Sequence, residues 1–136
     1  MDEAIHFRVK PEYKKLYFDV YIWANPSAML RHLRNIHGGS WKDSVGVFVV
    51  PRERPRLCLG EIHLNRKWLD HDTVAHEAQH AAIWWARHIK LPIGAMVTPD
   101  LPDAARIEER FCEGMGAIMH QINLVLKSEN YFQKEL

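Results

Sequence analysis

Alternating apolar and polar residues predict a β-strand near the start of the chain. Residues 14–23, KKLYFDVYIW, place four apolar side chains on one face of an extended segment, namely Leu16, Phe18, Val20 and Ile22. The opposite face carries Tyr17, Asp19, Tyr21 and Trp23. Two shorter apolar runs, VGVFVV at 45–50 and LCLGEIHLN at 57–65, predict two more strands.

Three other segments have the residue spacing of helices. The first covers residues 25–39, with Asn-Pro-Ser at its start and Gly-Gly at its end. The second runs from a cap at Thr73 to the proline at 92, and the third from about 102 to about 126. Strands followed by helices predict an α+β fold, with a small twisted sheet packed on the second helix and on a long C-terminal helix. No linker or repeat divides the chain, so residues 1–136 are predicted to form a single domain.

The composition is that of an ordinary globular domain. The chain has 136 residues, of which 47% are hydrophobic, and a formal net charge of +1, so no nucleic-acid partner is expected. The N-terminal segment MDEAIHFRVK lacks the apolar run of a signal peptide, and no apolar run is long enough to span a bilayer, so no membrane is expected. Cys58 and Cys112 are too few for a disulfide scaffold and are expected to be reduced, in the cytoplasm.

The candidate chemistry lies in the second predicted helix, where His76, Glu77 and His80 have the pattern H-E-x-x-H. Residues four apart share one face of a helix, so the two imidazoles can converge on one Zn²⁺ ion. Glu77 lies about 100° round the helix, where it can reach a metal-bound water from the side. The flanking residues are uncharged, so this helix is predicted to be packed on both sides. The alternative is two core histidines bonded to the backbone, with Glu77 at the surface.

The last predicted helix offers a third zinc ligand. Glu109, Glu113 and His120 share one stripe of its surface together with Gly116. Glu109 is the preferred ligand and Glu113 the preferred acceptor for the N–H group of a ligand histidine, while Glu113 and His120 remain open as ligands. Gly114 and Gly116 each cost helix stability, so both are predicted to be sites of close packing.

These residues resemble the gluzincin group of zinc metallopeptidases, in which an H-E-x-x-H helix is followed by a second helix that carries a glutamate ligand. The resemblance covers His76, Glu77, His80, Glu109 and Glu113. The short chain is similar to small single-domain metallopeptidases encoded in phage and bacterial genomes. The resemblance implies a minimal zincin-like domain whose sheet ends in an edge strand that binds extended substrate, and segment 57–65 lies where that strand would be.

The implied function is a zinc-dependent peptidase that acts on a peptide or protein, with a metal-bound water and Glu77 as general base. His120 is the candidate donor to the oxyanion, although a structural polar contact is an equal alternative. A second interpretation is a zincin-shaped metal-binding module that binds a partner protein without significant turnover. A third is a helical regulatory protein in which the motif is accidental, and the near-neutral charge argues against it. The sequence predicts no oligomeric state.

The chain has nine histidines, which is an unusual number for its length. His63 and His88 are weaker candidates for the oxyanion donor. The isolated histidines are predicted to lie at the surface, namely His6, His32, His37 and His71.

Overall fold

A mixed sheet forms the centre of the computed structural model, which describes residues 4–38, 45–97 and 103–129. Its strands are β1 (Ala4–Val9), β2 (Tyr17–Trp23), β3 (Gly46–Val49) and β4 (Cys58–Asn65). They lie side by side in the order β1-β2-β4-β3. β2 and β4 are parallel, whereas β1 pairs with β2 and β3 pairs with β4 in antiparallel fashion.

The predicted strands are all present, but their positions in the sheet correct one prediction. β4 was expected at the edge of the sheet, and this is wrong, because β4 is flanked by β2 and β3. The edge beside the second helix is formed by β3. β1 is a strand that was not predicted, although Ile5, Phe7 and Val9 alternate with polar residues as a strand requires.

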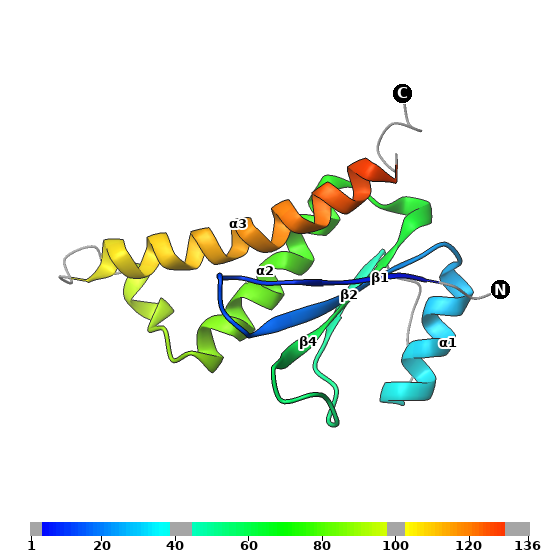
Figure 1. Cartoon of the computed structure of the whole chain (residues 1–136), viewed down its shortest axis with the longest axis horizontal. Coiled ribbons are helices and arrows are strands. Elements are labelled where there is room, and N and C mark those ends of the chain that lie inside the picture. Colours follow the sequence, from blue (N-terminus) through cyan, green and yellow to red (C-terminus); the bar gives the residue numbers. More distant parts are fainter. Residues whose placement is uncertain (1–3, 39–44, 98–102, 130–136) are drawn as a thin grey trace.

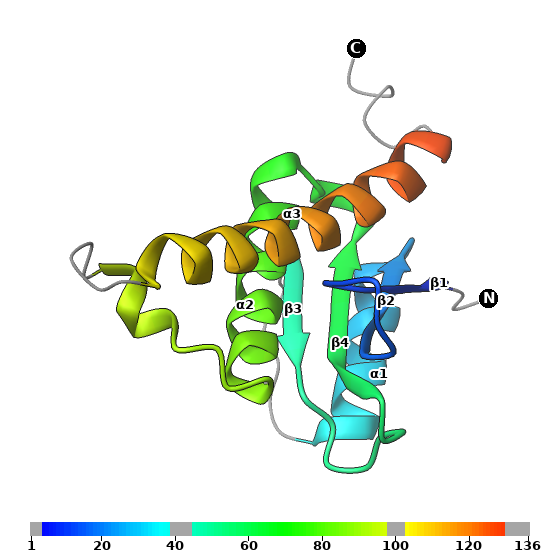
Figure 2. The same cartoon turned by 60° about the vertical axis from the view of Figure 1, so that its left-hand side comes forward.

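Three helices cover the two faces of the sheet (Figures 1 and 2). They are α1 (Pro26–His37), α2 (His71–His88) and α3 (Ala104–Ser128), and two short 3₁₀ turns, Arg66–Trp68 and Ile93–Val97, join the later elements. α1 lies on one face, and α2 and α3 lie on the other. The α+β prediction is confirmed. Within the described ranges, no helix is both long and apolar enough to cross a lipid bilayer.

The alternation in β2 divides the buried side chains into two cores. Phe18, Val20 and Ile22 face α2 and α3. They belong to the main core, together with buried residues of β1, β4, α2 and α3. Trp23, on the opposite face, belongs to a smaller core on the α1 side. The other fully enclosed members of this smaller core all come from α1, namely Ala28, Met29 and Leu33. The helix α1 is therefore attached to the sheet through its own small apolar contact.

Asp70 sets the start of α2. Its Oδ1 atom accepts hydrogen bonds from the backbone N–H and from the hydroxyl of Thr73, both at 2.7 Å, which satisfies donors of the first helical turn. The helix therefore begins at His71, three residues earlier than a cap at Thr73 predicts. It ends at His88, shortly before Lys90, whose positive φ of 58° turns the chain away.

The helices α2 and α3 approach each other closely at Gly114. A Cβ atom at Gly114 would overlap the ring of Trp85 and lie 2.6 Å from its Cη2 atom. The prediction of close packing is therefore confirmed at Gly114. It is wrong at Gly116, which is exposed and where a Cβ atom would have no other atom within 4 Å.

Candidate functional site

The two histidines of the H-E-x-x-H motif lie on one face of α2 and point at each other. Their Nε2 atoms are 3.1 Å apart, and their rings meet edge to face. Two nitrogens bound to one tetrahedral zinc at about 2.0–2.1 Å would be about 3.3–3.4 Å apart, so the pair needs little movement to hold an ion. The side chain of His76 is 65% exposed. The prediction that α2 is packed on both sides is therefore wrong, because its histidine face is open.

Glu77 is buried beside this open face, which excludes the alternative that it is a surface residue. It is 5% exposed, and its Oε1 atom lies 3.8 Å from Nε2 of His76. Burial raises the pKa of the Glu77 carboxyl above its ordinary value, and the neighbouring His76 and His80 offset part of this rise. The carboxyl therefore has the environment of a group that accepts and releases a proton.

The first residue of β3 packs directly against Glu77. A Cβ atom at Gly46 would lie 2.8 Å from Glu77 Cγ and 2.9 Å from Thr73 Cγ2, so only glycine fits there without displacing a neighbour. Gly46, Glu77 and His76 also line an open depression of about 360 Å³, together with Asp72. The edge of the sheet, the buried carboxyl and one histidine of the pair thus meet at a single surface depression.

The stripe on α3 that was predicted to complete the site lies elsewhere. Glu109, Glu113 and His120 are all exposed. Within the described part of the chain, the group of possible metal ligands around the pair contains His76, Glu77 and His80, with ligand atoms within 4.8 Å of one another. The structure therefore brings the H-E-x-x-H residues together but does not bring Glu109, Glu113 or His120 to them.

The acidic stripe of α3 does not reach the histidine pair because α2 and α3 contact each other through other faces. The contact is made by Trp85 and Gly114. His76 lies about 180° round α2 from Trp85, and Glu109 lies about 140° round α3 from Gly114. The histidine pair and the acidic stripe therefore point away from each other, and the apolar side of each helix fills the space between them.

A second histidine cluster, which was not predicted, lies on the α1 side of the sheet. Ligand atoms of His32, Glu61 and His63 lie within 4.8 Å of one another. His32 and His37 were predicted at the surface, and this is wrong, because both are half-buried between α1 and the sheet. His6, like His71, is exposed as predicted.

The sequence contains only a partial signal for this cluster. Glu61 and His63 are two residues apart in a strand, a spacing that places both side chains on the same face of the sheet. No spacing rule connects that pair to His32 and His37 in α1, because the connection depends on how the helix docks on the sheet. His63 itself is fully buried on the face opposite α2, which removes it as an oxyanion donor for the H-E-x-x-H site.

Comparisons with known proteins assign no family or function to the chain. No protein-family model, no curated protein and no solved structure matches the chain. What the site does is therefore inferred from the distances, burial and charge of its own residues.

Proposed function

We propose that this chain is a zinc-dependent peptidase in which His76 and His80 hold the ion and Glu77 is the general base. The observation that carries the proposal is the separation of 3.1 Å between the two Nε2 atoms, with a buried carboxyl beside them. Two imidazoles and an adjacent carboxyl are a donor set that suits zinc. When bound, zinc supplies an activated water and polarises a carbonyl group.

Glu77 accepts a proton from the attacking water and passes it to the leaving amine. A carboxyl whose pKa is raised by burial retains a proton more readily than an exposed one, so it can act first as a base and then as an acid. Gly46 packs against the Glu77 side chain and limits the positions that the carboxyl can adopt. This confinement favours one direction of proton transfer.

The strand β3 supports a peptide as the substrate class. It forms the end of the sheet, with β4 on one side only, and its first residue touches Glu77. An extended peptide that adds to such an edge forms main-chain hydrogen bonds with it. Pairing there would carry a peptide bond past the depression that contains His76 and Glu77. A cytoplasmic location belongs to the same proposal, since Cys58 and Cys112 are both free.

Neither Asp70 nor Asp72 completes the zinc site in this proposal. Asp72 lines the same depression, but it is eight residues from His80, about 12 Å along the helix axis, so one ion cannot reach both side chains. Asp70 accepts the capping hydrogen bonds from Thr73. The ligand atoms that lie together are those of His76, Glu77 and His80, so water and substrate are proposed to fill the remaining positions of the ion.

A metal-binding module without significant turnover is the second candidate function. It is favoured by one observation, namely that Glu109, Glu113 and His120 all lie on the exposed side of α3 rather than beside the pair. In this alternative the remaining zinc ligand comes from a partner protein. The two candidates differ in whether Glu77 performs chemistry.

Substitution of Glu77 by Gln tests the peptidase directly. Untagged wild-type protein loaded with zinc should cleave members of a broad peptide library, detected by mass spectrometry. Glu77→Gln should bind the same amount of zinc but lose cleavage by about 10²–10⁴-fold, because the general base is absent. His76→Ala should lose cleavage together with one equivalent of zinc.

His88→Ala is the matched control, because this histidine is exposed near the end of α2, about 12 Å along the axis from His80, which is too far to donate to an oxyanion at the pair. It should leave both zinc content and cleavage unchanged. Cleavage that survives in Glu77→Gln would rule out the proposed base. Zinc binding by the wild type with no cleavage of any peptide would favour the module.

A further inference from the structure

Three histidines surround the carboxylate of Glu61 on the α1 side of the sheet. The Nε2 atom of His63 lies 2.9 Å from Glu61 Oε1, and the Nε2 atom of His37 lies 3.5 Å from the same oxygen. His32 is the third, with a ligand atom within 4.8 Å of those of Glu61 and His63. The cluster therefore connects α1, which carries His32 and His37, to β4, which carries Glu61 and His63.

The hydrogen bonds of His63 fix its role. The indole N–H of Trp23 donates to Nδ1 of His63 at 3.0 Å. Because an indole can only donate, Nδ1 carries no proton, and the neutral ring must have its proton on Nε2. That proton is donated to Glu61, and the ring is fully buried. His63 therefore orients the carboxylate and has no lone pair on Nε2 for a metal.

His32 and His37 supply the other two imidazoles. The ring of His32 is half-buried, and its centroid lies 5.3 Å from that of His63. The ligand atoms within 4.8 Å of one another are those of His32, Glu61 and His63, and His37 joins them through its contact of 3.5 Å with Glu61 Oε1. The cluster thus contains a carboxylate with two imidazoles beside it in addition to His63.

We propose that His32, His37 and Glu61 bind a divalent transition-metal ion, with His63 as a positioning residue for the carboxylate. Imidazole and carboxylate donors together suit zinc, cobalt or nickel rather than calcium or magnesium. A carboxylate ligand is commonly held by a hydrogen bond of the kind that His63 donates. This site is separate from the H-E-x-x-H pair, which lies on the opposite face of the sheet.

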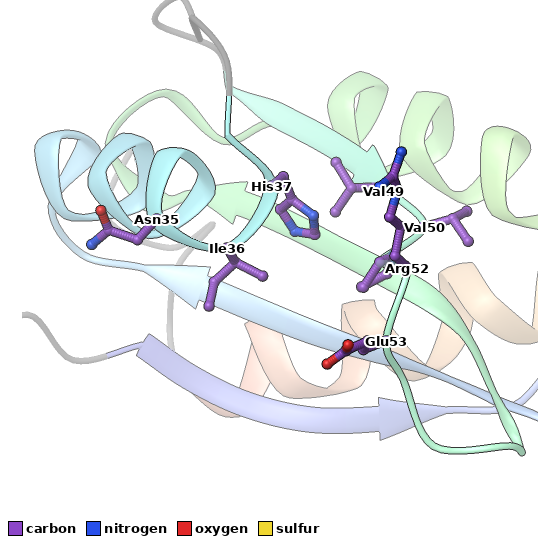
Figure 3. Close-up of a pocket in the computed structure, with 8 residues that line it drawn as sticks. Asn35, Ile36, His37, Val49, Val50, Arg52 and Glu53 are labelled. Carbon is purple, nitrogen blue, oxygen red and sulfur yellow. The ribbon is translucent and has the colours of Figure 1, made fainter.

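A cavity lies beside one member of the cluster, His37. His37, at the end of α1, faces a space of about 800 Å³ that is also lined by Val49 and Arg52 (Figure 3). This cavity is larger than the depression at His76, yet it contains no part of the H-E-x-x-H motif. It therefore borders the second cluster at His37.

A metal here would strengthen the attachment of α1. Apart from this cluster, α1 is held by a small core of four enclosed residues, Trp23, Ala28, Met29 and Leu33. An ion bound by His32 and His37 of α1 and by Glu61 of β4 would cross-link the helix to the sheet. Metal binding should therefore raise the thermal stability of the protein.

The experiment removes the first site and asks whether metal still binds. Untagged, EDTA-treated protein carrying His76→Ala and His80→Ala is titrated with Zn²⁺ by calorimetry and with Co²⁺ by visible absorption. We expect uptake of about one equivalent and a higher melting temperature, since the second site is intact. Adding Glu61→Gln should abolish both effects. His32→Ala should do the same, and it decides the question if Glu61→Gln does not fold.

Adding His88→Ala to the same background is the control and should leave the uptake unchanged. Far-UV circular dichroism and cooperative thermal unfolding establish that each variant is folded. The proposal is overturned if the folded His76→Ala, His80→Ala protein binds neither ion. It is equally overturned if uptake persists unchanged in the folded variants that also lack Glu61 or His32.

Discussion

Gly46 shows how one residue can control the candidate active site without any chemistry of its own. It lacks a Cβ atom at the point where β3 touches Glu77 and Thr73. A side chain at this position would press on the Cγ atom of Glu77, which is close to the backbone and cannot simply swing away. The position of the carboxyl is therefore set by a neighbour in the sheet as well as by its own helix.

Gly46→Ala should therefore reduce peptide hydrolysis by about 10-fold or more while zinc binding is retained, because a displaced base is poorly aligned. The measurement is the rate of cleavage of one identified peptide, with zinc content determined on the same samples. Gly94→Ala is the control, since nothing lies within 4 Å of a Cβ atom built there. Equal rates for Gly46→Ala and the wild type would contradict the confinement of Glu77.

Two glycines of α3 make a matched pair for stability. Gly114→Ala should lower the free energy of unfolding by about 1–3 kcal/mol, because its methyl group overlaps the ring of Trp85. Gly116→Ala should raise it by about 1 kcal/mol, because alanine favours a helix and the position is open. Urea denaturation of both variants measures the two changes. A Gly114→Ala protein as stable as the wild type would mean that the helices separate at no cost.

At the scale of helices and strands, periodicity predicted most of the fold. The apolar spacing in α2 and α3 and the alternation in β2 were sufficient to locate these elements. β1 was missed because it has only six residues, although Ile5, Phe7 and Val9 do alternate with the polar His6 and Arg8. The order of the strands could not be predicted, because β2 pairs in parallel with a segment about 40 residues away and no local signal specifies that partner.

The candidate site divides in the same way. His76, Glu77 and His80 were identifiable because a helix brings residues four apart together whatever the tertiary structure. The third ligand could not be identified from the sequence, because its position depends on which side of α3 faces α2. The sequence shows that Glu109, Glu113 and His120 share a stripe, but it does not show that Trp85 and Gly114 turn this stripe towards solvent.

The orientation of α3 leads to a comparison of two side chains as ligands. His80→Ala should weaken zinc binding at the His76 site by about 10-fold or more, since it removes one of the two proposed imidazole ligands. Glu109→Ala should leave the zinc affinity unchanged, since this side chain is exposed on the far side of α3. Competition with a chromophoric chelator measures both affinities. Weaker binding in Glu109→Ala alone would mean that α3 rearranges when the metal binds.

At the scale of the whole molecule, the cluster around Glu61 makes stability depend on pH. The folded state lowers the pKa of Glu61, so its contribution is present above the ordinary value of 4.5 and is lost as the pH falls through the folded value. The folded state also lowers the pKa of His32. As the pH falls through the ordinary value of 6.5, the unfolded chain therefore binds a proton on His32 before the folded protein does, which favours unfolding. Both effects make acid destabilising.

Measured in a Glu77→Gln background, because the raised pKa of Glu77 acts in the opposite direction, the free energy of unfolding of the metal-free protein should decrease from pH 7 to pH 5 through His32 and decrease further below pH 4.5. Urea denaturation at a series of pH values measures this profile. In His32→Gln, which does not titrate, the decrease between pH 7 and pH 5 should be smaller. Identical profiles for the variant and the wild type would exclude His32 as the source.

The separate small core beneath α1 has a consequence for the motions of the folded protein. α1 can detach by exposing few apolar side chains, whereas α2 and α3 cannot move without opening the main core. The free energy of such a local opening is lower than that of global unfolding. In heavy water, backbone amides of α1 should exchange for deuterium well before those in the middle of α2 and α3. The first helix would thus open and close many times within the lifetime of an intact sheet.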